Sequence, residues 1–230
     1  MNKNLPLNTE HLPVIDCGTM EYRSCLDLQL HIADETAEGR AAGAILLVEH
    51  PPVITTGIRR DLNRLVSTPE ELQQLGISLV PIKRGGGATA HNPGQLVIYP
   101  VMHLQRMGFR VAPYVHYLEN AVKHLLRTLG VDTRRIPRYP GLWAGERKIA
   151  SVGVQLHHGV CLHGIAVNLW NDLSIFNSIV ACGIEGVVMT NANQEGAQEL
   201  SMDDVKQLAA ASLAHGLPDP AGNKYDGRIV

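Results

Sequence analysis

One cysteine of the chain has the surroundings of a nucleophile. Cys182 lies in Val180-Ala181-Cys182-Gly183, after an apolar stretch and before a glycine, so its small neighbours leave room for a substrate carbonyl. A thiolate can attack a carbonyl or thioester carbon and carry the acyl group as a covalent intermediate. Most isolated cysteines are small core residues, however, so the local sequence leaves both roles open.

A lysine at the start of a strand-like run is the second candidate. Lys148 precedes Ile149 and Ala150, and alternation along a strand would place Lys148 and Ile149 on opposite faces of the sheet. Partial burial among small and β-branched residues would lower the pKa of the lysine and suit it to carry protons. A single lysine in a hairpin is more often a solvated strand residue, so this role also stays open.

The run from Lys83 to Pro100, KRGGGATAHNPGQLVIYP, has the composition of a ligand loop. Its consecutive glycines allow a ligand to approach the backbone, and bare N–H groups can hold an anion or a carbonyl oxygen. Arg84 can pair with a carboxylate or phosphate, and His91 can form a hydrogen bond to a ligand. The run is neither a Walker A loop nor a dinucleotide fingerprint, and a plain glycine-rich hairpin is the alternative.

The composition excludes several other kinds of protein. The chain has 230 residues, a net charge of −2, 45% hydrophobic residues and four cysteines without a C-x-x-C pair. Such a balance gives no general attraction to nucleic acid or membranes, and no apolar run approaches the length of a membrane span. No spacing of histidines and cysteines indicates a metal site. We therefore expect a cytoplasmic protein with reduced cysteines and no cofactor or metal.

The elements that must position these residues alternate along the chain. Apolar periodicity and turn residues predict helices at 22–40, 68–75, 111–129 and 202–214, and strands at 44–49, 78–82, 96–101, 141–144, 148–157 and 160–169. Gly145-Glu146 and His158-Gly159 are expected hairpin turns. The pattern predicts one α/β (α+β) domain over 1–230, with a mixed, largely antiparallel sheet and covering helices. Residues 1–13 and 217–230 are expected to be loosely held.

Taken together, the motifs resemble the octanoyltransferase family. That family shows an R-G-G-x-x-T-x-H-G-P-G-Q run, a G-x-K-I-A strand, an H-G-x-A-x-N strand and a cysteine before glycine. In the same order, this chain has Arg84-Gly85-Gly86, Thr89, His91, Pro93-Gly94-Gln95, Gly145, Lys148-Ile149-Ala150, His163-Gly164, Ala166, Asn168 and Cys182-Gly183. The matches span well over half of the chain.

Three positions depart from the family pattern. Asn92 replaces a glycine, Cys161 stands where a threonine or serine is common, and Ala181 replaces the proline before the cysteine. None of them removes a reacting group. Asn92 puts the local loop geometry in question, since asparagine tolerates positive φ less readily than glycine, and Ala181 relaxes the backbone that presents the nucleophile.

The resemblance implies a fold like the catalytic domain of biotin and lipoate protein ligases, with two catalytic residues in one pocket. Cys182 would be the acyl-thioester nucleophile, and Lys148 would stabilise its thiolate and shuttle the proton. An apolar tunnel and its oxyanion donors would come from the expected substrate-binding residues, which are Arg84, Gly85, Gly86, Gly87, Ala88, Thr89, Ala90, His91, Ser151, Val152, Gly153, Gly164, Ile165 and Ala166.

The implied reaction belongs to lipoate biosynthesis, or protein lipoylation. An octanoyl group would move from octanoyl-acyl carrier protein, through the Cys182 thioester, to a lysine of a lipoyl domain. The implied acceptors are the lipoyl domains of 2-oxoacid dehydrogenases and the glycine cleavage H protein, with no nucleic acid or membrane involved. Because such partners tend to be acidic, the basic residues Arg59, Arg60, Arg134, Arg135 and Arg138 could form a docking patch, although a solvated basic loop is an equal alternative.

Other functions remain in view. An ATP-dependent lipoate or biotin protein ligase on the same fold needs no cysteine nucleophile, so Cys182 disfavours it. A lipoyl amidotransferase, a non-catalytic lipid-binding protein and a papain-like protease are further alternatives. The protease lacks its usual sequence signature around Cys182.

Overall fold

The computed structural model describes residues 12–214, and its centre is one large mixed sheet. Its strands lie in the order β1 (Val14–Thr19), β2 (Gly43–Glu49), β6 (Gln95–His103), β10 (Val160–Asn168), β9 (Arg147–His157), β8 (Tyr139–Ala144) and β7 (Arg134–Ile136). The short β11 (Val188–Met189) pairs with β9 outside this path. Among the described residues of this sheet, only β1 with β2 and β11 with β9 are parallel, so the predicted mixed, largely antiparallel sheet is confirmed.

A second sheet has the order β4 (Ser78–Pro81), β3 (Val53–Thr56) and β5 (Thr89–His91). The chain passes from this sheet into the large one at Pro93-Gly94, so the glycine-rich run is not a hairpin within a single sheet. β3 and β5 were not expected, because they are short and β3 directly follows the two prolines that close β2. β1, β7 and β11 were missed as well.

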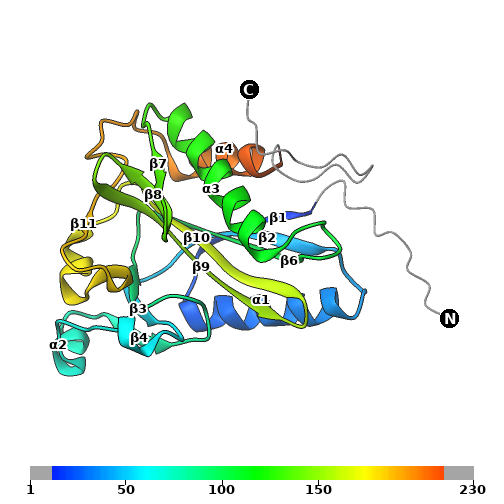
Figure 1. Ribbon diagram of the computed structural model, residues 1–230, viewed down its shortest axis with the longest axis horizontal. Helices are drawn as coiled ribbons and strands as arrows, with labels where there is room; N and C mark the ends of the chain where they lie inside the picture. The colour runs from blue at the N-terminus through cyan, green and yellow to red at the C-terminus, as the bar shows by residue number, and fades with distance from the viewer. Residues whose placement is uncertain (1–11, 215–230) are drawn as a thin grey trace.

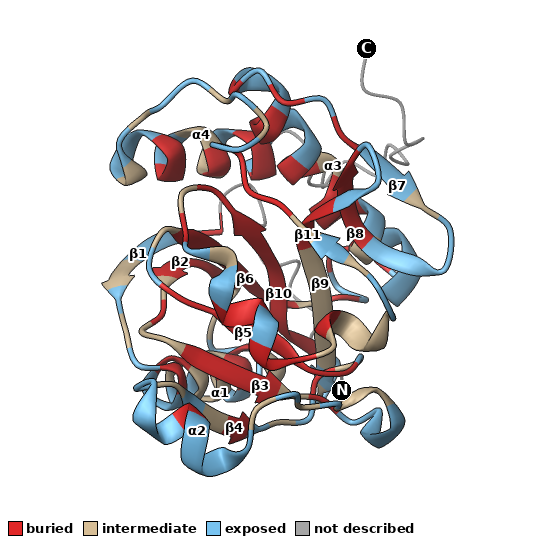
Figure 2. Ribbon diagram, turned by 90° about the vertical axis from the view of Figure 1, so that its left-hand side faces the viewer, coloured by how far each residue is buried: buried red, intermediate tan, exposed pale blue. Residues whose placement is uncertain are grey.

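Helices cover both faces of the large sheet (Figure 1). α3 (Val111–Thr128) and α4 (Met202–Ala214) pack over one face, whose core includes Leu47, Ile98 and Ile165. α1 (Tyr22–Ala37) lies on the opposite face, where Cys25 packs with Leu46 and other residues of β2, β6 and β10. Figure 2 shows β6 and β10, in the middle of the sheet, as buried along almost their whole length.

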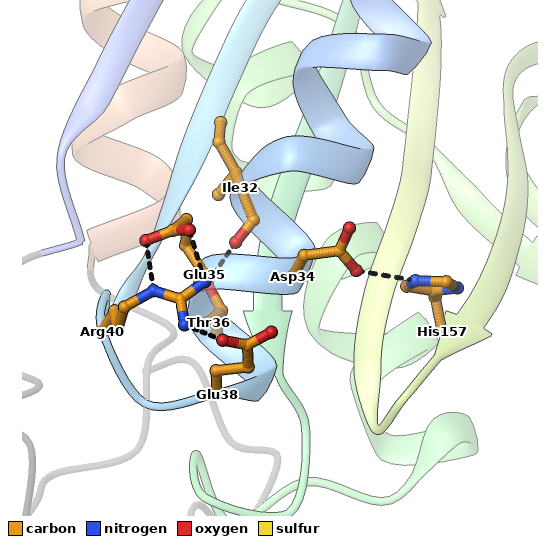
Figure 3. A network of polar contacts seen from close by, with 7 residues as sticks. All are labelled: Ile32, Asp34, Glu35, Thr36, Glu38, Arg40 and His157. Atoms are coloured by element: carbon orange, nitrogen blue, oxygen red, sulfur yellow. Dashed lines mark hydrogen bonds and ion pairs between the residues drawn. The ribbon is translucent and has the colours of Figure 1, made fainter.

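Polar contacts fix the C-terminal end of α1 (Figure 3). His157 at the end of β9 contacts Asp34 at 3.0 Å, which joins the helix to the β9–β10 hairpin. Arg40, just beyond the helix, pairs with Glu35 at 2.6 Å and also with Glu38. Thr36 donates its hydroxyl to the Ile32 carbonyl at 2.7 Å. These contacts hold the end of α1 that lies farthest from Tyr22.

All four predicted helices and all six predicted strands occur close to their expected positions. α2 (Pro69–Gln74) begins with a capping box, because Thr68 Oγ1 accepts a hydrogen bond from the Glu71 amide and the Glu71 carboxylate accepts one from the Thr68 amide. Residues 1–13 were expected to be loosely held, but the side chain of Leu12 packs in the core. The remainder of that expectation, residues 1–11 and 217–230, lies outside the described residues. Within residues 12–214, no helix has the length and apolarity needed to cross a bilayer.

Candidate active site

A cavity of about 540 Å³ lies against the large sheet, with Tyr22 of α1 and Val115 of α3 both in its lining. It is bounded by the glycine-rich run, by strands β9 and β10, and by the loop that carries Cys182. Of the residues predicted to form the site, those that line it are Arg84, Gly85, Gly86, Gly87, Thr89, His91, Lys148, Ser151, Val152, Gly153, Gly164, Ile165, Ala166 and Cys182. The structure therefore brings both proposed catalytic residues to one cavity.

Cys182 lies in a short 3-10 turn, Ala181–Gly183, with an unusual backbone conformation. Its φ of 57° falls in the left-handed region, which non-glycine residues rarely adopt and which occurs often at functional sites. The Cys182 amide donates to the Ala88 carbonyl at 2.9 Å, and this bond ties the nucleophile to the glycine-rich run. The sulfur, which is half-buried, lies 3.7 Å from the Ser151 hydroxyl oxygen.

The glycine after the cysteine is required by close packing. Gly183 has a φ of +67°, and a Cβ there would lie 2.6 Å from two side-chain carbons of Leu62. Leu62 itself lines the cavity. Because residue 183 lacks a side chain, the turn that carries Cys182 can pack closely against Leu62.

A β-bulge places Lys148 on the cavity side of β9. β8 and β9 pair at Leu142–Ala150 and next at Trp143–Lys148, so β9 carries one extra residue at Ile149. Lys148 and Ser151 are three positions apart and would face opposite sides of a regular strand. Because of the bulge, Lys148 and Ser151 both line the cavity. Ile149 and Ala150 instead enter the core on the sheet face covered by α3 and α4.

The amine of Lys148 is almost completely enclosed. The residue is 1% exposed, its Nζ donates to the Pro140 carbonyl at 2.7 Å, and it lies 4.8 Å from the centre of the Trp143 ring. Burial lowers the pKa of Lys148 below its usual 10.5, and the nearby Cys182 and Glu119 oppose that shift. The predicted burial and lowered pKa are therefore present.

Arg84 is buried, and among the described residues it has no carboxylate partner. Its guanidinium donates to the carbonyl and hydroxyl of Thr55 at 2.9 and 2.8 Å, and to the Gly85 carbonyl at 3.0 Å. Burial lowers the pKa of Arg84, while Tyr22 and Cys182 favour its charged form. A Cβ at Gly153 would lie 2.9 Å from Arg84 Cδ, so the glycine makes room for this side chain. The charge is thereby fixed beside the cavity.

One end of the cavity is formed by histidines and tyrosines. His91 bonds Gln95 at 2.7 Å through Nδ1, and Tyr22 contacts His163 Nδ1 at 3.3 Å. Burial lowers the pKa of both His91 and His163 to about 3, so both rings are neutral near pH 7. His163 Nε2 has no hydrogen-bond partner among the described residues. A neutral ring with a free nitrogen can accept or donate a hydrogen bond to a ligand.

Several residues at this end of the cavity were not predicted from the sequence. Tyr22 opens α1, far from the motifs, so no local spacing indicated it, whereas Tyr99 lies in β6 near the end of the Lys83–Pro100 run and was not singled out there. His163 was part of the H-G-x-A-x-N match, and its motif could have added it to the site. Its φ of 60° is not visible in a sequence.

Two predicted site residues do not line the cavity. Ala88 and Ala90 are fully buried in the core between the small sheet and the Cys182 loop. Asn92, the departure from glycine, is not among the residues with positive φ. Its amide instead donates to the Asp172 carbonyl at 2.8 Å and its oxygen accepts from Asn171. Asparagine therefore fits this loop without backbone strain.

The predicted basic residues are not equivalent in the structure. Arg59 and Arg138 line the cavity. Arg134 pairs with Glu146, and Arg135 pairs with Glu119 at 2.6 Å. Within residues 12–214, no group of three or more His, Cys, Asp and Glu side chains could hold a metal ion.

Comparison with known proteins identifies the family. The model of the lipoyl protein ligase A/B catalytic domain matches residues 21–214. An octanoyltransferase from Syntrophobacter fumaroxidans is 38% identical over 200 residues, covering 87% of this chain and 88% of that protein. Both matches include the glycine-rich run and the cysteine loop within a nearly complete alignment of the chain.

Solved structures share the fold at low sequence identity. A bipartite lipoate protein ligase from Thermoplasma acidophilum superposes with a TM-score of 0.64 at 17% identity, covering 90% of this chain and 84% of that one. A biotin protein ligase from Aquifex aeolicus gives a TM-score of 0.50 at 11% identity, covering 89% and 69%. The predicted relation in fold to these ligases is confirmed. By its sequence and fold, the chain belongs to the octanoyltransferase family of enzymes, within the lipoyl protein ligase A/B catalytic-domain group.

Proposed function

We propose that this protein transfers an octanoyl group from octanoyl-acyl carrier protein to a lysine of a lipoyl domain, through a thioester on Cys182. One observation carries the proposal. The thiol of Cys182 and the buried amine of Lys148 line one cavity, where Cys182 favours the charged form of Lys148 and so raises its pKa. The name of the relative supports the octanoyl group as the cargo.

In the first half-reaction, the neutral amine of Lys148 removes the thiol proton of Cys182. The resulting thiolate attacks the thioester carbonyl of the donor, the new C–S bond forms, and the carrier's thiol leaves with the proton from Lys148. Burial favours this role because it lowers the pKa of Lys148 and so increases the fraction of neutral amine. Thioester exchange is close to isoenergetic, so the step needs no ATP.

In the second half-reaction, the amine of the acceptor lysine attacks the Cys182 thioester. The amide bond forms, the C–S bond breaks, and Lys148 accepts the proton that the acceptor nitrogen loses. That proton then returns to the Cys182 thiolate, which restores the starting state. The Cys182 amide is already bonded to Ala88, so the oxyanion would need other donors, and the backbone near Gly86 and Gly164 is the proposed source.

Basic side chains at the cavity favour acidic protein partners. Arg59 and Arg138 line it, but Arg59 pairs with Asp61 at 3.1 Å, and Arg134 and Arg135 pair with glutamates. We expect Arg138→Glu to slow transfer more at low salt than at high salt, because screening weakens the interaction with an acidic carrier. Transfer rates that are equal to wild type at both salt concentrations would show that Arg138 is only a solvated residue.

The deciding experiment is incubation with octanoyl carrier protein and an apo lipoyl domain, without ATP, followed by intact mass measurement. The wild type should gain one octanoyl group on Cys182 with carrier alone, and should pass it to the lipoyl domain. Cys182→Ala should do neither, while Cys17→Ala, a half-buried cysteine outside the cavity, should behave as wild type. Full transfer by Cys182→Ala would reject the thioester route. Product that forms only with ATP would indicate a ligase.

A further inference from the structure

A buried carboxylate stands behind the catalytic lysine, outside the cavity. Glu119 lies in the middle of α3 and is 3% exposed. One of its oxygens accepts a hydrogen bond from the Gly141 amide at 2.8 Å. The other accepts from Arg135 Nε at 2.6 Å. Glu119 does not line the cavity, and the reaction proposed above gives it no part.

The peptide group between Pro140 and Gly141 connects this carboxylate to Lys148. Its N–H donates to Glu119, and its carbonyl accepts from Lys148 Nζ at 2.7 Å. Hydrogen bonds on both sides of one amide polarise it and strengthen each other. The carbonyl is thus held in place and made a better acceptor for an ammonium group.

The backbone at this position is specific to glycine. Gly141 has a φ of +119°, and a Cβ there would lie 2.1 Å from the Ala150 carbonyl oxygen and 3.1 Å from Lys148 Nζ. The peptide can therefore lie directly between α3 and the lysine only because residue 141 lacks a side chain.

We infer that Glu119 is a positioning residue for Lys148, acting through the Pro140–Gly141 peptide to hold the amine in place and to favour its ammonium form. This inference rests on the proposed role of Lys148 as proton carrier. The groups that favour the charged form of Lys148 are Cys182, which lines the same cavity, and Glu119, whose own charge is partly balanced by Arg135. Arg59, Arg84 and Arg138 line the same cavity.

Two substitutions should move the titration of Lys148 in opposite directions. Glu119→Gln keeps the size and a hydrogen-bond acceptor but removes the negative charge, so Lys148 should lose its proton at a lower pH, by on the order of one pH unit. Arg135→Gln, at an exposed residue, leaves the Glu119 charge less balanced, so Lys148 should keep its proton to a higher pH. A merely structural role would not produce shifts of opposite sign.

The titration can be followed by NMR of the Lys148 Nζ nitrogen in the full chain, without substrate, alongside the pH profile of octanoyl transfer. In each variant, the acid limb of the pH profile of octanoyl transfer should shift in the same direction as the titration of Lys148. Glu146→Gln, which removes an exposed glutamate paired with the neighbouring Arg134, is the matched control and should change neither.

Unchanged titration in Glu119→Gln, or shifts of the same sign in both variants, would overturn the inference. If Glu119→Gln does not fold, the titration of Lys148 in Arg135→Gln tests the inference by itself: a shift to higher pH supports it, and no shift overturns it. If the Lys148 titration shifts in opposite directions in the two variants but the wild-type protein transfers no acyl group, Glu119 does act on Lys148 and the proposed function is rejected.

Discussion

At the scale of single residues, the catalytic proposal depends on an amine that can exist without its proton. Lys148 is enclosed by protein, and its burial disfavours the charged form, so its pKa lies below that of an ordinary lysine. Its Nζ is fixed by Pro140 and faces the ring of Trp143. These contacts hold the amine in place inside the protein.

Replacement by arginine tests the need for proton transfer. Lys148→Arg retains a positive charge that can stabilise a thiolate, but a guanidinium stays protonated and cannot accept the thiol proton. We expect octanoyl transfer to fall by at least about a hundredfold, the usual contribution of a general acid or base. The measurement is the rate of octanoyl-lipoyl domain formation by mass spectrometry. Near-normal transfer by this variant would mean that Lys148 acts through its charge alone.

At the scale of elements, the hairpin of β8 and β9 decides which side chains reach the cavity. The extra residue at Ile149 turns Lys148 toward the side that Ser151 also faces, and Gly141 allows β8 to lie against it. A local irregularity in one strand pair therefore sets the geometry of the site.

A pair of glycine substitutions tests this hairpin. In Gly141→Ala, a methyl group meets the Ala150 carbonyl oxygen at 2.1 Å, so we expect a loss of unfolding free energy of more than about 3 kcal/mol and weaker octanoyl transfer. Gly130→Ala also has positive φ (+88°) but meets nothing within 4 Å, so it should cost only about 1 kcal/mol and leave transfer unchanged. Urea unfolding and the transfer assay measure both effects. Equal losses in the two variants would contradict the role given to close packing.

The regular elements could be predicted from the sequence, whereas the site geometry could not. α3 and α4 follow apolar periodicities with clear stops, and these depend only on neighbouring residues. The bulge at Ile149 and the left-handed Cys182 depend on pairing with other strands and loops. Tyr22 meets His163 across 141 positions of the chain. Motifs indicated Cys182 and Lys148, but only the tertiary structure brings in Tyr22, Tyr99 and Glu119.

At the scale of the whole molecule, buried neutral histidines couple the fold to pH. Burial lowers the pKa of His50 to about 4, and those of His91 and His163 to about 3, from 6.5. Below pH 6.5 the unfolded chain binds protons at these sites that the folded protein does not bind. Their contribution to stability is therefore complete above pH 6.5 and is lost as the pH falls toward 3 to 4.

We expect the unfolding free energy to fall by about 3 kcal/mol between pH 6.5 and 5.5, about 1 kcal/mol for each of the three histidines. Urea unfolding at these two pH values, compared with pH 7.5, checks this. His163→Gln should reduce the slope, whereas the exposed His124→Gln should not. Stability that is constant from pH 7.5 to 5.5 would contradict the burial of neutral rings.

If Cys182 carries an acyl thioester as proposed, the enzyme must avoid acylating the lysine in the same cavity. With an octanoyl group on Cys182, capture of the acyl group by Lys148 would form a stable amide and inactivate the enzyme. The hydrogen bond from Nζ to the Pro140 carbonyl holds this nitrogen against the backbone, which restricts its attack on an acyl group carried by Cys182. The same tether that holds a proton carrier in place thereby protects the protein from modifying itself.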